Sequence, residues 1–460
     1  MPEFPTGFVW GTATSSYQIE GAATQDGRGQ SVWDAFSHTA GKIADGTNGD
    51  DACDHYNQWR EDVGLLHQLG ANAYRLSIAW PRILPEGTGA VNERGLSFYD
   101  ELVDGLLEVG VEPWVTLFHW DYPQELLHRG GWLNRESADW FAEYTQVVVD
   151  RLSDRVSNWI TLNEPQCFIG LGHGTGTHAP GLRLNLQDLL LITHHVLLAH
   201  GRAVQVIRTR AKTPPRVGWA SVGHVNYPET DSPADIEAAR DATFSIPETW
   251  TWNMAWYADP ICRGYYPEAG LRRFGHAAVR PRPGDMQTIH QPTDFFGLNI
   301  YAGEPISLGA EGQVRPAKRV DGHAHTNMGW PVAPESLYWG PRFIAERYEL
   351  PVYITENGMA NLDWVGTDGR VRDPQRIDYT RRYLAELRRA VADGVDVRGY
   401  FHWSLLDNFE WAEGFRKRFG LVHVDFATKQ RVPKDSFAWY RNIIATNGAS
   451  LDIAQTEAAS

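Results

Sequence analysis

The chain has 460 residues, of which 42% are hydrophobic and 22% charged, a balance typical of a globular protein with a large core. Its formal net charge of −15 disfavours binding to nucleic acid or to an anionic membrane. Its three cysteines are too few for a disulfide framework and match no zinc-binding spacing. We therefore predict a cytoplasmic protein with reduced thiols. Nothing in the sequence sets an oligomeric state.

Neither a secretory signal nor a membrane span is expected. The first residues lack the basic region and apolar stretch of a signal peptide. The most apolar helical candidate, 189–198, is interrupted by Thr193, His194 and His195. We predict that this segment is too short and too polar to cross a bilayer.

Short apolar or β-branched runs alternate along the chain with segments of helical period. The strand candidates are 8–10, 73–76, 112–117, 159–162, 216–220, 295–299, 352–355 and 397–401. The helix candidates include 58–69, 96–109, 137–152, 188–208, 335–348 and 375–392. Strands that are each followed by a helix predict an α/β fold, a single closed (β/α)8 TIM barrel spanning 1–460. A doubly wound open sheet is the rival, but no Gly-rich phosphate-binding turn follows the first strand.

Three long segments, 166–185, 223–240 and 303–334, carry no clear periodicity and are predicted to be irregular. Loops of this length are uncommon in a compact domain unless they are functional. On a barrel, the loops after the strands surround the active site. We expect these three segments to form the walls of a pocket.

Two glutamates follow strand candidates in the same way. Residues 161–165 read TLNEP and residues 354–358 read ITENG, so Glu164 and Glu356 each end an apolar or β-branched run. On a parallel barrel both carboxylates would meet at the mouth. Two carboxylates that face one site are the minimal equipment for cleaving a glycosidic bond. The 19 tryptophans mildly favour carbohydrate as well, because aromatic faces stack on pyranose rings.

The chain closely resembles glycoside hydrolase family 1, the β-glucosidase family. Besides the two glutamate motifs, the resemblance rests on FVWGTATSSYQIEG at 8–21, YRLSIAWPR at 74–82, LFHWD at 117–121 and WSLLDNFEW at 403–411. It runs from about residue 8 to about residue 442, leaving a short C-terminal tail at 446–460. The motifs occur in the order expected for the family.

The resemblance implies a retaining mechanism in which Glu356 is the nucleophile and Glu164 the acid/base. Arg75 would keep Glu356 ionised, and the negative charge of Glu356 would raise the proton affinity of Glu164. No metal or organic cofactor is expected, since the carboxylates supply nucleophile, acid and base. The expected partner is a small β-glucoside or oligosaccharide.

The resemblance also implies a set of substrate-binding side chains. Trp403 would stack on the sugar, and Tyr301 would contact Glu356 through its hydroxyl. Trp120, Cys167, His173 and Trp330 would lie on the leaving-group side. The full set of implied substrate-binding residues is Gln18, His119, Trp120, Asn163, Asn299, Tyr301, Trp330, Trp403, Glu410, Trp411 and Phe419.

Glu410 bears on the choice of sugar. A carboxylate there can accept bonds from the 4-OH and 6-OH of a sugar but would repel a 6-phosphate. We interpret Arg416, Lys417 and Arg418 as a solvated basic face, not as a phosphate site. The expected activity is exo-acting hydrolysis of cello-oligosaccharides and of aryl or alkyl β-glucosides, with transglycosylation and with β-galactosidase or β-fucosidase side activity. A 6-phospho-β-glycosidase and a non-catalytic sugar-binding protein remain the alternatives.

Overall fold

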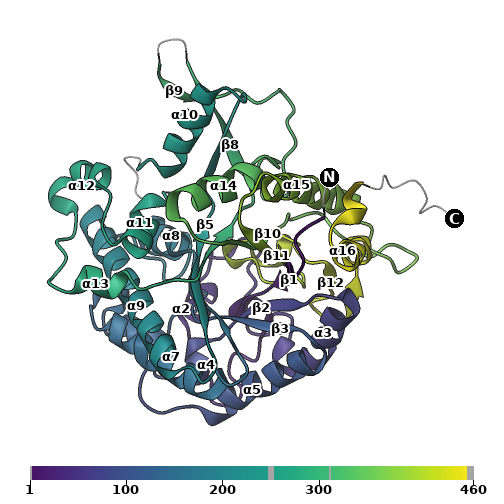
Figure 1. The fold of residues 1–460 in the computed structure, drawn as a ribbon. Coiled ribbons are helices and arrows are strands. Elements are labelled where there is room, and N and C mark those ends of the chain that lie inside the picture. Colours follow the sequence, from purple (N-terminus) through teal and green to yellow (C-terminus); the bar gives the residue numbers. More distant parts are fainter. Residues whose placement is uncertain (1–2, 247–252, 310–311, 453–460) are drawn as a thin grey trace.

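The computed structural model describes residues 3–246, 253–309 and 312–452. Eight parallel strands close into a barrel in the order β1-β11-β10-β7-β5-β4-β3-β2, and helices surround them (Figure 1). β1 pairs with both β2 and β11, so the sheet has no free edge. The predicted (β/α)8 barrel is confirmed.

All eight predicted strands fall on barrel strands. Regular pairing shifts at the carboxyl ends of β4 and β10, between Ile160 and Asn163 and between Ile354 and Glu356. Such irregularities change the direction of the side chains around them. The one in β4 directly precedes Glu164, and the one in β10 includes Glu356, so each lies at a predicted catalytic glutamate. The barrel strands are β1 Val9–Ala13, β2 Ala73–Ser77, β3 Glu112–Thr116, β4 Asn158–Asn163, β5 Arg216–Val222, β7 Phe295–Asn299, β10 Val352–Asn357 and β11 Val397–Trp403.

Helix α7 (Ser137–Leu152) shows how an outer helix buries one apolar face. In this helix, the buried Phe141, Tyr144, Val148 and Leu152 recur at helical spacing and point to the barrel. The predicted helices all exist. The α-helices are α1 Ser16–Ile19, α2 Val32–Ser37, α3 His55–Leu69, α4 Trp80–Ile83, α5 Glu93–Glu108, α6 Gln124–His128, α7, α8 Pro165–Ile169, α9 Leu186–Arg210, α10 Pro233–Phe244, α11 Ala255–Arg263, α12 Glu268–Phe274, α13 Asp285–Ile289, α14 Ser336–Tyr348, α15 Pro374–Ala392 and α16 Asp435–Ala445.

Helix α9 corrects one prediction. It has 25 residues and is long and apolar enough to cross a membrane, whereas the segment 189–198 was expected to be too short. Its polar residues do not interrupt it, because Thr193 donates to the carbonyl of Leu189 and His194 bonds to Tyr266 and Asp285. Its most apolar window is 78% buried inside the protein, as a core helix would be.

The inside of the barrel is filled by side chains that alternate along each strand. Trp114 lies at the centre, with its ring centroid 5.4 Å from Phe295, 4.7 Å from Tyr353 and 5.2 Å from Phe401. Residues two positions further along a strand face the same way. Arg75, two residues after the buried Ala73, therefore lies in the next layer toward the mouth.

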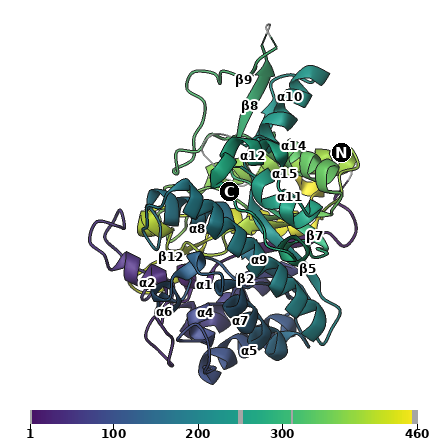
Figure 2. The same ribbon diagram turned by 90° about the vertical axis from the view of Figure 1, so that its left-hand side faces the viewer.

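The three long segments contain regular structure, contrary to the prediction. A small sheet, in the order β6-β8-β9, joins β6 (Val225–Pro228) to β8 (Gly303–Leu308) and β9 (Val314–Pro316). It projects from the barrel together with α10 (Figure 2). Residues 166–185 include most of α8 and the π-helix η2 (Gly170–Thr175). Strands β6 and β9 were missed because they are very short, and β6 pairs with β8 far along the chain.

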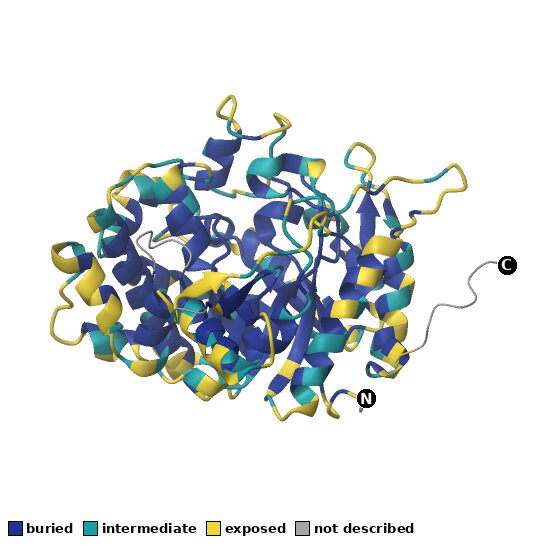
Figure 3. Cartoon of the chain, turned by 90° about the horizontal axis from the view of Figure 1, so that it is seen from above, coloured by how far each residue is buried: buried dark blue, intermediate teal, exposed yellow. Residues whose placement is uncertain are grey.

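The 3-10 helices η1 (Gly131–Leu133) and η3 (Gly275–Ala277) lie earlier in the chain. The other short elements lie toward the C-terminus. They are the strands β12 (Val422–Val424) and β13 (Arg431–Pro433) and the 3-10 helices η4 (Trp411–Arg416) and η5 (Ala449–Asp452). The predicted tail, 446–460, contains η5, and its residues 453–460 lie outside the described residues. Figure 3 shows the buried interior enclosed by helices whose outward faces are exposed.

Candidate active site

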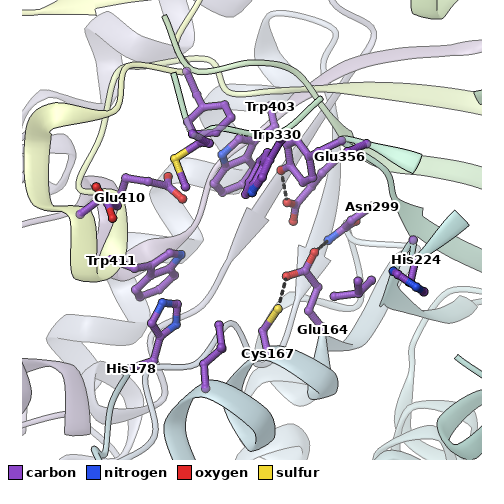
Figure 4. A pocket seen from close by; sticks show the side chains of 18 of the residues that line it. Glu164, Cys167, His178, His224, Asn299, Trp330, Glu356, Trp403, Glu410 and Trp411 are labelled. Atoms are coloured by element: carbon purple, nitrogen blue, oxygen red, sulfur yellow. Dashed lines mark hydrogen bonds between the residues drawn. The ribbon is translucent and has the colours of Figure 1, made fainter. Parts of the chain in front are cut away.

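A pocket of about 550 Å³ opens at the carboxyl ends of the barrel strands. Its size is typical of a small-molecule site. Glu164 and Glu356 both line it, as do Asn299 at the end of β7, Trp403 at the end of β11, and Glu410 in the segment after β11. Figure 4 shows these side chains converging on one space. Residues from all three long segments line it too, which confirms that these segments form its walls.

Glu356 is held on both carboxylate oxygens. Arg75 Nη1 lies 2.5 Å from Oε1, and the Tyr301 hydroxyl donates to Oε2 at 2.6 Å. Arg75 and Glu356 are both buried, so their ion pair is poorly screened. Arg75 also donates to the Thr355 carbonyl and to Asn163 Oδ1, which fixes the guanidinium plane.

Glu164 lies at the turn between β4 and α8. Its φ of 45° is in the left-handed region, which non-glycine residues adopt rarely and mainly at functional sites. The turn directs its carboxylate into the pocket, and Pro165 begins the following helix. Asn299 Nδ2 donates to Oε1 at 2.9 Å, and Cys167 Sγ lies 3.1 Å from Oε2 (Figure 4). Both of these partners are neutral.

The two carboxyl groups differ electrostatically. Burial, followed by the negative charge of Glu356, raises the pKa of Glu164 to about 7. The predicted effect of Glu356 is therefore present but second to burial. Burial also raises the pKa of Glu356, but the Arg75 guanidinium and the Tyr301 hydroxyl oppose that rise. Glu356 is the carboxyl that ionises first, and Glu164 is the one that retains a proton near neutrality.

A hydrogen-bonded layer lies beside this pair. Asn163 Oδ1 accepts from Arg75 Nη2 at 2.5 Å, so its Nδ2 is the donor that reaches His119 Nε2 at 3.0 Å. Burial holds the pKa of His119 well below its usual value, so the imidazole is neutral. With Nε2 accepting, its proton resides on Nδ1. That atom is buried and has no hydrogen-bond partner among the described residues.

Glu410 and its neighbours form the opposite wall. Gln18 Nε2 lies 3.3 Å from Glu410 Oε2 and also donates to the Phe409 carbonyl. Trp411 has a left-handed φ of 50° and packs against Trp120 at 4.6 Å between centroids. Partial burial, together with the charges of Glu356 and Glu164, raises the pKa of Glu410 to about 8.

Most of the predicted residues line the pocket. They are His119, Trp120, Glu164, Cys167, Asn299, Tyr301, Trp330, Glu356, Trp403, Glu410, Trp411 and Phe419. Gln18, Arg75 and Asn163 lie behind that lining and bond to it. His173 was expected on the leaving-group side but does not line this pocket, because its buried ring bonds to the Phe168 carbonyl.

Several lining residues were not predicted. Most of them are contributed by the long segments, where only the position of the wall could be expected. Burial lowers the pKa of one of them, His178, to about 4. The unpredicted residues include Leu171, Thr177, His178, His224, Glu304 and Met328.

The basic run is not a solvated face. Only Arg416 is exposed. Lys417 Nζ donates to the Asn327 carbonyl, and Arg418 Nη1 pairs with the buried Asp407 at 2.7 Å. The interpretation was wrong for these two side chains because the chain folds back to bring the Asn327 carbonyl to Lys417 and the Asp407 carboxylate to Arg418. None of the three lines the pocket.

Comparison with known proteins identifies this constellation. The model of the family described as Glycosyl hydrolase family 1 matches residues 1–449. The chain belongs to glycosyl hydrolase family 1. It is 46% identical over 450 residues to β-glucosidase A of Thermotoga maritima, covering 97% of this chain and 99% of that protein. It is 42% identical over 474 residues to a bifunctional β-D-glucosidase/β-D-fucosidase of Bifidobacterium breve, covering 97% of this chain and 99% of that protein.

Solved structures of the family agree with the fold. The β-glucosidase from Thermotoga maritima in complex with glucoimidazole superposes with a TM-score of 0.89 and 46% identity, over 97% of this chain and 99% of that chain. The same enzyme in complex with noeuromycin also gives a TM-score of 0.89, with 46% identity over 97% of this chain and 100% of that chain. The chain is thus a glycoside hydrolase with a TIM barrel, and its pocket has the place of the active site in such barrels.

Proposed function

We propose that the chain is a retaining, exo-acting β-glucosidase. Its substrates would be cello-oligosaccharides and aryl or alkyl β-glucosides, from which it removes terminal non-reducing β-D-glucosyl residues. The observation that carries the proposal is the unequal pair of carboxylates, with Glu356 beside the Arg75 guanidinium and Glu164 beside neutral donors. The names of the relatives support glucose as the sugar.

The first half-reaction uses the two carboxyl groups in different ways. Glu356 attacks the anomeric carbon, and the leaving-group oxygen takes the proton of Glu164 as its bond to that carbon breaks. The product is a covalent glycosyl-enzyme ester on Glu356. Because the ester carries no charge, the pKa of Glu164 then falls. Glu164 is left as a carboxylate.

In the second half-reaction, Glu164 takes a proton from water, which attacks the anomeric carbon and releases glucose with retained configuration. An alcohol or a second sugar can replace water at this stage, and the result is transglycosylation. His119, Asn163, Gln18 and Glu410 would bind the sugar hydroxyls. Trp403 would stack on the ring.

The electrostatics of the pocket favour a sugar without phosphate. The neighbouring carboxylates already raise the pKa of Glu410, so the site disfavours one further negative charge. A phosphate group near Glu410 would add nearly two negative charges. The pocket walls supply no compensating cation from the run Arg416 to Arg418. A neutral glycone is therefore preferred over a 6-phosphorylated one.

Side activity on β-fucosides and β-galactosides is part of the proposal. The bifunctional name of the Bifidobacterium breve relative supports the fucosidase activity. A fucoside lacks the 6-OH, and a galactoside changes the orientation of the 4-OH. Both differences fall on the Glu410 side of the sugar and leave the carboxylate pair unaffected.

Initial rates on nitrophenyl β-glucoside and on its 6-phosphate test the proposal. We expect turnover of the first and little of the second, whereas the reverse ranking identifies a 6-phospho-β-glycosidase. Binding of glucose without any turnover would indicate a sugar-binding protein. A panel of β-1,2-, β-1,3-, β-1,4- and β-1,6-linked disaccharides, with and without added glucose, then defines the linkage preference.

We further propose that the chain is one catalytic domain that works in the cytoplasm. Its three cysteines, Cys53, Cys167 and Cys262, are all free, which suits a reducing compartment. Mass spectrometry of the thiols after rapid alkylation in cells tests this compartment. Oxidised thiols would contradict it.

A further inference from the structure

Tyr301 lies outside the regular barrel sheet, although its hydroxyl contacts Glu356. Strand β7 ends at Asn299, and β8 begins only at Gly303. The Tyr301 carbonyl accepts hydrogen bonds from two tyrosine hydroxyls of helix α15, Tyr379 at 2.9 Å and Tyr383 at 3.0 Å. Two donors use both lone pairs of that carbonyl. Its position is thus set by α15 and not by strand pairing.

The directions of these bonds follow from the other partners of the two hydroxyls. Asn357 Nδ2 points at the Tyr379 oxygen at 3.3 Å, and the Ala333 amide donates to the Tyr383 oxygen at 2.8 Å. Since both nitrogens can only donate, each hydroxyl keeps its own proton to donate, and the Tyr301 carbonyl is within reach of both hydroxyls. The two hydroxyls also interact with each other. Asn357 follows Glu356 directly in the sequence. Tyr379 therefore joins the side chain of the residue after Glu356 to the backbone carbonyl of Tyr301.

The two tyrosine side chains are packed together in the interior, and both hydroxyls stay protonated. The rings stack at 4.0 Å between centroids with 22° between their planes. Their side chains are almost fully buried, with exposed fractions of 2% and 0%. Burial raises the pKa of both hydroxyls far above the usual value, so neither ionises under working conditions. They donate their protons at every pH at which the enzyme is active.

We propose that Tyr379 and Tyr383 are positioning residues that hold the Tyr301 hydroxyl against Glu356 and thereby set the ionisation and orientation of the nucleophile. This inference rests on the proposed function, in which Glu356 attacks the sugar. The chain of contacts runs from α15 to the Tyr301 carbonyl, and from the Tyr301 hydroxyl to Glu356 Oε2 at 2.6 Å. Neither tyrosine of α15 lines the pocket, so neither is a catalytic residue.

The pH dependence of kcat/KM reports this effect, because its acidic limb follows the ionisation of Glu356 in the free enzyme. A Tyr301 hydroxyl that is displaced from Oε2 stabilises the carboxylate less, so the limb moves to higher pH. The tyrosine variants leave unchanged all the charged and titratable groups that surround Glu356. These are Arg75, Glu164, Cys167, Tyr301 and Glu410.

The experiment compares Tyr379→Phe, Tyr383→Phe and the double variant with Tyr301→Phe. We expect the double variant to lose roughly ten-fold in kcat/KM and its acidic limb to rise by about 0.5 pH unit. Each single variant should show a smaller change of the same sign. Tyr440→Phe is the matched control, since its buried hydroxyl also donates to a backbone carbonyl, that of Gly11 at 2.9 Å. Its acidic limb should not move.

The decisive comparison combines Tyr379→Phe and Tyr383→Phe with Tyr301→Phe in one protein. If the tyrosines act through the Tyr301 hydroxyl, they should have no further effect on the acidic limb there. An additive shift overturns the proposal. So does a fully folded double variant with an unmoved limb, even if its melting temperature falls, because the tyrosines would then only stabilise the fold. If the double variant does not fold, the two single variants give the same comparison.

Failure of this inference is distinguishable from failure of the proposed function. Azide rescue of a Glu356→Gly variant tests the nucleophile without reference to α15. Intact rescue together with unmoved acidic limbs rejects only the role of the tyrosines. Absence of rescue rejects the role of Glu356 itself.

Discussion

Arg75 Nη1 lies 2.5 Å from Glu356 Oε1, whereas among the described residues no cation contacts Glu164, whose partners are the Asn299 amide and the Cys167 thiol. This asymmetry separates two chemically identical side chains into one that is ionised and one that retains its proton. A retaining glycosidase requires that difference before the substrate binds. Both carboxylates lie at strand ends, so the barrel fold brings them close together. The groups that contact each carboxylate determine which one is ionised and which one donates a proton.

Arg75→Lys should keep a positive charge but lose the fixed fork of donors. Arg75 contacts Thr116, Asn163, Thr355 and Glu356 together, and an ammonium cannot satisfy all four. We expect kcat/KM to fall by more than about ten-fold and the acidic limb of its pH profile to move to higher pH, because Glu356 loses stabilisation of its charge. Steady-state rates across pH measure both. An unchanged acidic limb would contradict the role given to Arg75.

Glu164→Gln should affect substrates according to their leaving groups. General acid catalysis contributes roughly 10²–10⁴-fold to a rate, and poor leaving groups depend on it most. Cellobiose turnover should fall by this factor, while dinitrophenyl β-glucoside should form the glycosyl-enzyme at nearly the normal rate. Pre-steady-state kinetics should then show a burst, because the second half-reaction lacks its base. Equal loss of glycosyl-enzyme formation with both substrates would show that Glu164 is not the proton donor.

Cys167→Ala should move the basic limb of kcat/KM, which follows the deprotonation of Glu164 near pH 7. The thiol hydrogen bond favours the ionised carboxylate, so its removal raises the pKa of Glu164 and moves the limb to higher pH. Cys167→Ser retains a donor, and a stronger one, so it should move the limb in the opposite direction. If the basic limb moves in the same direction in both variants, the cause is a change in packing and not the hydrogen bond from residue 167.

Glu410→Gln should change how stability depends on pH. The pKa of Glu410 in the folded enzyme, about 8, exceeds its unfolded value, so the folded state binds more protons between these values. Its contribution to stability is present at low pH and is lost as the pH rises toward 8. The melting temperature of the unliganded wild type should fall over this range, and less steeply in Glu410→Gln. Parallel curves for the two proteins would refute this assignment.

Much of the site could be predicted from sequence because it follows from local patterns. Glu164 and Glu356 each end a short apolar run, and strand ends of a parallel barrel meet at one mouth. The side chain of Arg75 could be expected to reach Glu356 only through the family resemblance, since their strands are far apart in the chain. The barrel itself follows from the alternation of strands and helices.

Other features depend on contacts that leave no trace in a local pattern. The helical period of α15 predicts a buried face for Tyr379 and Tyr383, but not that their hydroxyls reach the Tyr301 carbonyl. Likewise, the basic character of Arg418 does not reveal the buried Asp407 that pairs with it. The strands β6 and β9 are only four and three residues long, and β6 pairs with β8 over a long separation, so a local pattern does not mark this small sheet.

The central claim is that Glu356 is the nucleophile and Glu164 the proton donor, and Glu356→Gly with added azide tests it most directly. The small anion can occupy the space of the missing carboxylate and attack the anomeric carbon. We predict that turnover of dinitrophenyl β-glucoside is abolished without azide and restored with it, and that NMR identifies the product as the inverted α-glucosyl azide. Wild-type activity in Glu356→Gly without azide, or a β-configured azide product, would contradict the account.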